Sequence, residues 1–490
     1  MWITAEILKD DFLYEYATLQ DAASPNTSDL ELAARFMNHV AFKIQDNDRT
    51  SSVHVRLLLD VFKFFTESYL AANDIHSVAS AYDPEIRKLI LASYFKAFSA
   101  LEERDGVTKP PSSALLRDAA SSKTSIFGLF GGQGVNEVCF DELQSLYDIY
   151  KPFIVTFLET MIREVLEPFA MKENTTAYYR HGFDVITWLS NSALRPPVHY
   201  LASIPISFPL IGLTQLVQYL ITCRVAGMNP GDMRNILSGA TGHSQGIVSA
   251  VAIAASESFE DFTANAIKAL KWLFYSGLRG QQAFPVVSLD PRIVQDSVEG
   301  GEGMPSPMLL ITGLRLTELE PHLHKTNSYL EQGSQIHVSL HNGPRAFVVT
   351  GPPKSLFGLV TSLRKVRAAP GADQSKIPFS QRKPTFFVRF LPVGVPYHSE
   401  YLQGATDSVL RDLEGEELWQ ASDLKISVFN TEDGKFDFHP RNISCTTRCF
   451  RFRLARTQDF DHSFPMRPGL YFTSSLDEGN KFPGNSHTCY

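Results

Sequence analysis

The sequence has few cysteines and no long basic block. Its five cysteines lie at irregular positions, which excludes a disulfide framework and paired metal spacings and is typical of a reducing cytosol. The chain has 45 Lys and Arg against 53 Asp and Glu, a net charge of −8, which argues against nucleic acid as a partner. Hydrophobic residues make up 44% and charged residues 20% of its 490 residues. These values exclude wholesale disorder and predict two or three compact units.

Membrane-directing segments are also scarce. Met1–Glu6 reaches an acidic side chain at once and lacks the apolar core of a signal peptide. One stretch, Pro196–Cys223, contains no Lys, Arg, Asp or Glu and imitates a membrane span. Within it, Pro205, Pro209 and Gln215 favour a buried strand-turn-helix instead. We expect a cytoplasmic protein without membrane contact.

The chain divides into regions of different character. Residues 1–120 carry apolar side chains at helical spacing and are expected to form a helical N-terminal region, ending in a Gly-, Pro- and Ser-containing segment at 105–113. Residues 121–434 alternate strand and helix patterns, which predicts an α/β core with parallel strands. Within this core, about 305–370 has the strand-helix-strand-strand-helix order of a ferredoxin-like insert.

The last segment, 435–490, differs in composition from the rest. Its 56 residues contain eight Phe and three of the five Cys, but one Ile and no Val. Strands of an α/β domain are rich in aliphatic β-branched residues. We therefore expect an atypical, poorly ordered tail.

The strongest chemical signal is the sequence Gly-His-Ser-Gln-Gly at 242–246. Gly242 and Gly246 flank Ser244 as in a nucleophile elbow, where a sharp turn between a strand and a helix exposes the hydroxyl. The first amides of the following helix favour a developing oxyanion. A surface serine between two glycines is the alternative; the strand and helix patterns on either side favour the nucleophile.

A serine hydroxyl needs a base to remove its proton. His398 follows a predicted strand in the Pro- and Gly-containing loop 394–399, where active-site residues commonly lie. A solvent-exposed loop histidine fits the same pattern, and both interpretations stay open at this level. His243, beside Ser244, is expected to pack under the turn.

Two other polar residues follow predicted strands. Gln133 lies in the glycine-rich turn Phe130–Gly134 and is a candidate for an oxyanion-hole amide; a phosphate cradle would need the Lys-Ser/Thr pair of a P-loop, which is missing. Asn342 is a candidate to orient His398 or a bound acyl group. A plain turn residue before Gly343 is an equal interpretation of Asn342.

Four motifs together resemble one family: Gly128–Gly134, Leu237–Ala254, Asn342–Pro353 and Pro396–Ser399. They are similar to the acetyltransferase domain of the fungal type I fatty acid synthase beta subunit, a multifunctional enzyme. The resemblance covers most of residues 30 to 434, and Gln245 in place of a leucine after the nucleophile is typical of that domain.

The resemblance implies the malonyl/acetyl-transferase fold, in which an α/β-hydrolase-like core carries a ferredoxin-like insert. It also implies a catalytic dyad of Ser244 and His398, with oxyanion-hole amides at Gln133 and Gln245. Further substrate contacts are expected at four positions: Gly132, His243, Ser276 and Asn342.

One position bears on the acyl group. Malonyl-transferring relatives carry an Arg-Gly pair on the helix after the nucleophile, because a guanidinium pairs with the free malonyl carboxylate. The matching pair here is Ser276-Gly277, and an uncharged residue suits acetyl. The small serine also leaves room for a longer acyl chain. Arg279, three positions on, is expected to point elsewhere.

The implied reaction is a ping-pong transfer from acetyl-CoA, or another short acyl-CoA, through an acyl-serine to the phosphopantetheine thiol of an acyl carrier protein. This is the priming step of fatty acid synthesis in a fungal synthase or a related starter-unit synthase. No metal or redox cofactor is expected. Acyl carrier protein and the synthase alpha subunit are the expected partners, in a hetero-oligomer.

Two other functions stay open. An α/β serine hydrolase or thioesterase shares the elbow and normally places an acid before the histidine, for which Asp290, Asp296 and Asp373 are candidates. The other is an inactive assembly fragment that only contacts the alpha subunit. The resemblance stops at Gly434, and the other regions of a beta subunit are missing. We therefore expect a truncated product, which an unspliced intron, a frame change or a shortened gene would explain. Whether this product is active stays open.

Overall fold

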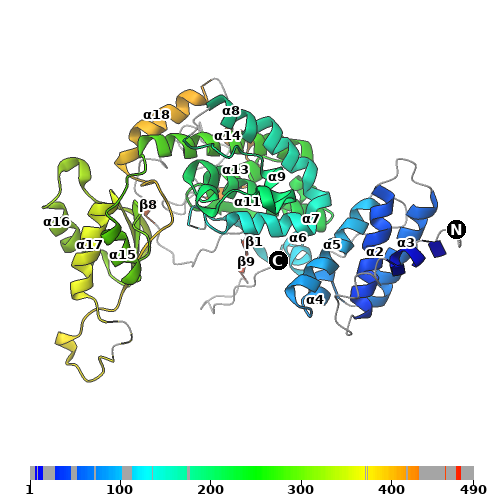
Figure 1. Ribbon diagram of the computed structural model, residues 1–490, viewed down its shortest axis with the longest axis horizontal. Helices are drawn as coiled ribbons and strands as arrows, with labels where there is room; N and C mark the ends of the chain where they lie inside the picture. Colours follow the sequence, from blue (N-terminus) through cyan, green and yellow to red (C-terminus); the bar gives the residue numbers. More distant parts are fainter. Residues whose placement is uncertain are drawn as a thin grey trace.

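In the computed structural model, N-terminal helices lie at one end, an α/β core in the middle and a small α/β insert at the other end (Figure 1). The structure describes residues 6–7, 9–14, 28–45, 52–70, 73–101, 113–134, 136–173, 177–369, 371, 373–414, 418–429, 458–459 and 471–475. Most of the segment predicted at 105–113 lies outside the described residues. So does the tail from 435, apart from two short strands.

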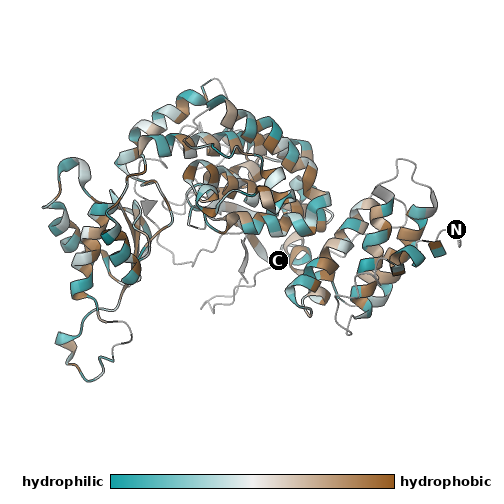
Figure 2. Cartoon of the chain, viewed as in Figure 1, coloured by the Kyte–Doolittle hydropathy of each residue, from teal (hydrophilic) through white to brown (hydrophobic). Residues whose placement is uncertain are grey.

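The N-terminal region is helical. Its helices are α2 (Asp29–Gln45), α3 (Ser52–Tyr69), α4 (Ile75–Ala79), α5 (Pro84–Leu101) and α6 (Ala114–Ala120). Hydrophobic and hydrophilic residues both occur along these helices (Figure 2), and Phe65 on α3 is fully buried, with its ring 6.3 Å from that of Tyr94 on α5. The bundle meets the core where the ring of Phe95 on α5 packs 4.9 Å from the ring of Tyr150.

The core sheet has the order β7-β2-β1-β9. Its strands are β1 (Ser125–Phe130), β2 (Leu237–Gly242), β7 (Val428–Phe429) and β9 (Tyr471–Ser475). β1, β2 and β7 are parallel, and β9 from the tail is antiparallel to β1. In the parallel pair Phe130 lies opposite Gly242, so β1 and β2 end at the same edge of the sheet.

Helices surround this sheet. The long ones are α7 (Cys139–Met161), α11 (Ile204–Val225) and α14 (Phe259–Ala283), and the elbow opens the shorter helix α13 (Gly246–Ala254). The other short helices are α8 (Glu167–Glu173), α9 (Val185–Ser190), α10 (Val198–Leu201), α12 (Pro230–Asn235) and α18 (Gln403–Asp412), and a π-helical turn spans Ile162–Leu166. All residues of α13 are buried, because this helix lies between the sheet and α11 and α14.

Helix α11 corrects one expectation. The stretch predicted as a strand-turn-helix forms a continuous helix from Ile204. Pro205 is tolerated because it lies in the first turn, where its missing N–H would have no helical partner. By length and composition α11 could cross a membrane, but 94% of its most apolar 18-residue window is buried inside the protein. Burial of all faces explains its uniform hydrophobicity.

The insert is built on a second sheet of order β6-β3-β5-β4-β8. Its elements are α15 (Pro291–Glu299), β3 (Met308–Thr312), α16 (Leu316–Asn327), β4 (His337–Gly343), β5 (Ala346–Thr350), α17 (Pro353–Val366) and β6 (Phe387–Phe390), with β8 (Gln458–Asp459) from the tail. β3, β4, β5 and β6 pair antiparallel, and α16 and α17 pack together over a separate apolar cluster. This is the ferredoxin-like arrangement expected from the sequence.

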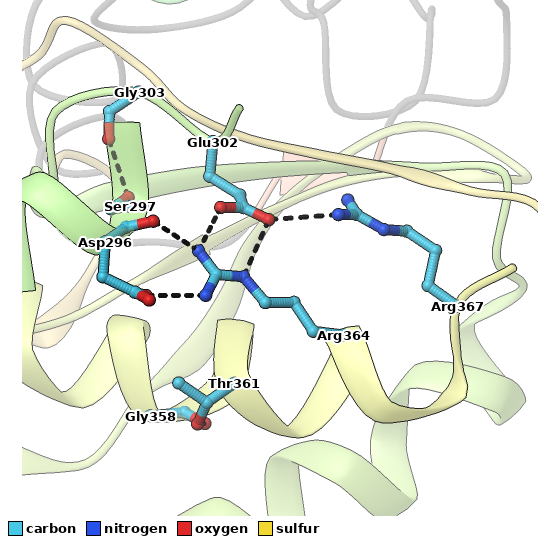
Figure 3. A network of polar contacts seen from close by, with 8 residues as sticks. All are labelled: Asp296, Ser297, Glu302, Gly303, Gly358, Thr361, Arg364 and Arg367. Carbon is cyan, nitrogen blue, oxygen red and sulfur yellow. Dashed lines mark hydrogen bonds and ion pairs between the residues drawn. The ribbon is translucent and has the colours of Figure 1, made fainter. Parts of the chain in front are cut away.

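A buried carboxylate fixes the start of the insert (Figure 3). The Glu302 side chain is 1% exposed. It accepts hydrogen bonds from Arg364, which lies in the last turn of α17, and from Arg367 at 3.2 Å. Arg364 also donates to Asp296 on α15 at 2.6 Å. A buried charge needs such paired, hydrogen-bonded partners. The network therefore ties α15, the approach to β3 and the end of α17 together.

Candidate active site

Ser244 lies in a tight turn between β2 and α13. Its φ of 50° falls in the left-handed region, which costs a non-glycine residue free energy and is common at functional sites. The turn excludes side chains on both sides. A Cβ added to Gly242 would lie 2.1 Å from the backbone carbon of Gly246, and one added to Gly246 would lie 2.3 Å from the carbonyl oxygen of Phe130. The two glycines are thus required sterically, as the elbow pattern predicts.

His398 lies within hydrogen-bond distance of Ser244. Its Nε2 is 2.8 Å from the Ser244 Oγ, and its backbone also has a left-handed φ, of 60°. The residue is 2% exposed, so the alternative of a solvent-exposed loop histidine is wrong. A hydroxyl and an imidazole at this distance are the geometry of an activated nucleophile and its base. Their catalytic roles stay predictions.

Tyr397 anchors the loop that carries His398. Its ring packs 5.1 Å from the ring of Phe208 on α11, and its hydroxyl donates to the carbonyl of Ser276 on α14 at 3.4 Å. Burial raises the pKa of Tyr397 well above its ordinary value, so the hydroxyl stays a neutral donor. The histidine is therefore fixed between two helices of the core.

Gln133 and Gln245 lie together beside the elbow. The side-chain amide of Gln133 donates to Gln245 Oε1 at 2.7 Å, and Gln245 is 2% exposed at the start of α13. Among the described residues, neither backbone N–H donates to a backbone carbonyl in a turn or loop. Two backbone N–H groups next to a nucleophile, with no such bond among the described residues, fit an oxyanion hole.

Gly132 and His243 pack against each other. A Cβ added to Gly132 would lie 2.9 Å from His243 Nδ1 and 3.2 Å from the Cβ of Ser244. The backbone N–H of His243 donates to the carbonyl of Phe130 at 2.8 Å. This contact joins the two strand ends, so His243 lies at the turn and Gly132 permits the close approach.

Three of the predicted site residues hold buried oxygens without a hydrogen-bond partner among the described residues. They are Gln133 Oε1, Ser276 Oγ and Asn342 Oδ1. Ser276 lies on α14 under Tyr397 and is 0% exposed, whereas Asn342 lies near the end of β4 in the insert. An unsatisfied buried oxygen costs about 1–3 kcal/mol, so these atoms are candidates to accept donors from a bound ligand.

Arg279 points away from the predicted acyl position. Its guanidinium donates to both Asp412 oxygens, at 2.6 and 2.8 Å, and lies 3.0 Å from a Glu173 carboxylate oxygen. These hydrogen bonds to Asp412 raise the pKa of Arg279 above its ordinary value. The guanidinium is engaged between α14, α18 and α8.

The acids considered for a hydrolase triad are engaged within the insert or on its surface. Asp290 caps α15 and pairs with Arg292 at 3.1 Å, and Asp296 pairs with Arg364. Asp373 accepts from the backbone N–H of Ser375 at 2.8 Å. These contacts are structural and give the hydrolase alternative no support.

Sequence reasoning missed the polar residues that hold the loop after β1. Gln215 on α11 donates to the carbonyl of Gly131 at 2.7 Å and accepts from the Ser249 hydroxyl at 2.8 Å. Asn136 accepts from the N–H of Gly134 at 3.1 Å. A glutamine in the middle of a mostly apolar, buried helix was the available signal, because buried amides are found where they bond specific partners.

The part of the chain that the structure describes contains no candidate metal site. No group of three or more His, Cys, Asp or Glu side chains there lies close enough together to hold an ion. The expectation that no cofactor is needed stays a prediction.

Two family descriptions match the chain. Residues 128–384 match "Starter unit:ACP transacylase in aflatoxin biosynthesis", where ACP is acyl carrier protein, and residues 1–101 match "N-terminal domain in fatty acid synthase subunit beta". The first match covers the elbow, Gln133, Ser276 and Asn342, and ends before His398.

Similar curated proteins include fungal fatty acid synthase beta subunits. The chain is 38% identical over 415 residues to that of Saccharomyces cerevisiae, which covers 83% of this chain and 20% of the relative. It is 37% identical over 441 residues to that of Schizosaccharomyces pombe, with 88% and 20% covered. The chain thus spans about a fifth of the length of these relatives.

Among solved structures, the malonyl CoA-acyl carrier protein transacylase of Coxiella burnetii is similar at 16% identity and a TM-score of 0.44, over 69% of this chain and 81% of that one. A loading acyltransferase from the avermectin modular polyketide synthase gives 16% identity and a TM-score of 0.43, over 68% and 80%.

Proposed function

Because this chain belongs to the starter unit:ACP transacylase family and is homologous to fungal fatty acid synthase beta subunits, we propose that it transfers a short acyl group from coenzyme A to acyl carrier protein. The observation that carries the proposal is the hydrogen bond of 2.8 Å between Ser244 Oγ and His398 Nε2 at a strained elbow. Acyl transfer through a serine needs a base within hydrogen-bond reach of the hydroxyl, and His398 meets this condition.

In the first half-reaction, His398 Nε2 takes the Ser244 hydroxyl proton while Oγ attacks the thioester carbon. The carbonyl oxygen becomes an oxyanion, which the backbone N–H groups of Gln133 and Gln245 stabilise. The carbon–sulfur bond then breaks, and His398 returns its proton to the departing coenzyme A thiolate. The product is an ester between the acyl group and Ser244.

The second half-reaction reverses these steps with a new thiol. His398 takes the proton of the phosphopantetheine thiol, whose sulfur attacks the ester carbon. The tetrahedral intermediate collapses with cleavage of the carbon–oxygen bond, and Ser244 regains its proton from His398. The net reaction exchanges one thioester for another and needs no oxidant or metal.

Acetyl is the proposed acyl group. Ser276 carries no charge, and the Arg279 guanidinium is engaged by Asp412 and Glu173, so neither supplies a free cation for a malonyl carboxylate. The small Ser276 side chain leaves space for butyryl. Acyl carrier protein and the synthase alpha subunit as partners, and a cytoplasmic location, belong to the same proposal.

Transfer kinetics test the acyl preference. The full chain is incubated with a phosphopantetheinylated acyl carrier protein and acetyl-, butyryl- or malonyl-CoA, and Ser244→Ala serves as the inactive control. We expect acetyl transfer to exceed malonyl transfer by about 100-fold, the discrimination from a missing charged partner. Equal rates for acetyl and malonyl would contradict the acetyl assignment.

A further inference from the structure

The side chains of the two proposed oxyanion residues hydrogen-bond to each other. Gln133 Nε2 donates to Gln245 Oε1 at 2.7 Å, across 112 positions of sequence. Gln245 is buried, while Gln133 is half-buried in the loop after β1. The bond therefore links the loop after β1 to the elbow after β2, which are the two segments that would supply the oxyanion amides.

The link continues to a third element. Gln245 Nε2 donates to the carbonyl of Phe208 on α11 at 3.0 Å. Both polar ends of the Gln245 amide are thus used, which fixes its orientation. From the same helix, Gln215 holds the Gly131 carbonyl at the other side of the loop. Helix α11, which is buried along nearly its whole length, is therefore a common reference for both segments.

We propose that the Gln245 side chain is a positioning residue that fixes the separation of the two oxyanion N–H groups; this inference rests on the proposed function. Oxyanion stabilisation depends on donors that are already in place before charge develops. A hydrogen bond between amides shielded from water is strong and directional. Loss of the link lets the loop move relative to the elbow, and small displacements of catalytic groups are costly to the rate.

Side-chain variants isolate this role because the backbone N–H groups remain. Gln245→Leu and Gln133→Leu each remove the link at similar side-chain volume. In the full chain, we expect either to slow acylation of Ser244 by acetyl-CoA by about 10- to 100-fold, with the KM for acetyl-CoA changed by less than about twofold. Gln245→Leu also removes the bond to Phe208, whereas Gln133→Leu removes only the link. The double variant should therefore be no slower than Gln245→Leu alone, because that variant has already lost the link.

Gln218→Leu is the matched control. It replaces another glutamine by leucine, on α11, and removes a hydrogen bond of 2.6 Å to Glu142 on α7 that is no part of the Gln133–Gln245 link. We expect its acylation rate to equal that of the unaltered chain. Melting temperatures of all variants identify any loss of fold. If Gln245→Leu does not fold, the acylation rate of Gln133→Leu, at a half-buried position, tests the proposal.

The possible results separate two failures. Rate losses that multiply in the double variant, unchanged acylation rates, or an effect confined to KM would overturn the positioning role. Absence of any acyl group on Ser244 in the unaltered chain would instead overturn the proposed function. A loss in kcat shared by the two single variants and not exceeded in the double variant supports the inference.

Discussion

At the residue scale, the site depends on backbone conformations that few residues adopt. Ser244 and His398 both have a left-handed φ, and each is fixed by its surroundings. Gly246 makes the elbow possible because its Cα lies against the carbonyls of Phe130 and Gly131. The packed core around the two reactive residues holds them in these strained backbone conformations.

Gly246→Ala tests this steric requirement. The added Cβ would lie 2.3 Å from the carbonyl oxygen of Phe130, the last residue of β1, and 2.5 Å from that of Gly131. Both are backbone atoms, so the clash cannot be relieved by a side-chain rotation. We expect a loss of about 3 kcal/mol in the free energy of unfolding and no measurable acylation of Ser244. Gly404→Ala on α18, where a Cβ meets nothing within 4 Å, should melt at or above the unaltered temperature.

Arg279 provides a second test at this scale. Its ion pairs with Asp412 and Glu173 predict a structural role, so Arg279→Gln should lower the free energy of unfolding by about 3 kcal/mol. The ratio of acetyl to malonyl transfer should stay unchanged. A changed ratio would show that Arg279, and not Ser276, occupies the position that reads the acyl group.

At the scale of elements, sequence patterns located most strands and helices but not their contacts. The elbow, the strand β1 and the insert follow from periodicity and glycine placement. The prediction of a strand-turn-helix for α11 was wrong because it assumed that Pro205 and Pro209 interrupt a helix. Pro205 lies in the first turn, where a helix tolerates proline. The tethers of Gln215 and Gln245 depend on tertiary neighbours, which a pattern within one segment does not contain.

A half-buried histidine between α4 and α7 predicts that the stability of the protein depends on pH. His76 Nε2 lies 2.8 Å from the Tyr150 hydroxyl, and burial lowers the pKa of His76 below its ordinary value despite the opposing effect of Asp74. Below a pH of about 6.5 the unfolded chain therefore binds a proton that the folded chain does not. The stability from neutral His76 is complete above that pH and is lost as the pH falls toward the folded pKa.

His76→Gln measures this contribution. The melting temperature of the unaltered chain should fall more steeply between pH 7 and 5 than that of the variant, in buffers of equal ionic strength. Parallel curves for the two proteins would contradict the assignment. His324→Gln, on α16 in the insert, is the control and should leave the slope of the unaltered chain in place.

At the scale of the whole molecule, the fold brings distant segments to one place. β1 and β2 are parallel neighbours, so the loop with Gln133 and the elbow with Ser244 meet at one sheet edge. The chain then leaves the core to form the insert and returns through β6 to place His398 against Ser244. The sequence predicted both residues from their motifs; their distance depends on how the insert rejoins the core.

The most direct measurement of the central claim is mass spectrometry of the 490-residue chain after incubation with acetyl-CoA. We predict one acetyl group, located on the peptide that contains Ser244, absent in Ser244→Ala and formed about 1,000-fold more slowly in His398→Ala. An unmodified Ser244 in the folded, unaltered chain, or equal acetylation in the Ser244→Ala variant, would contradict the account.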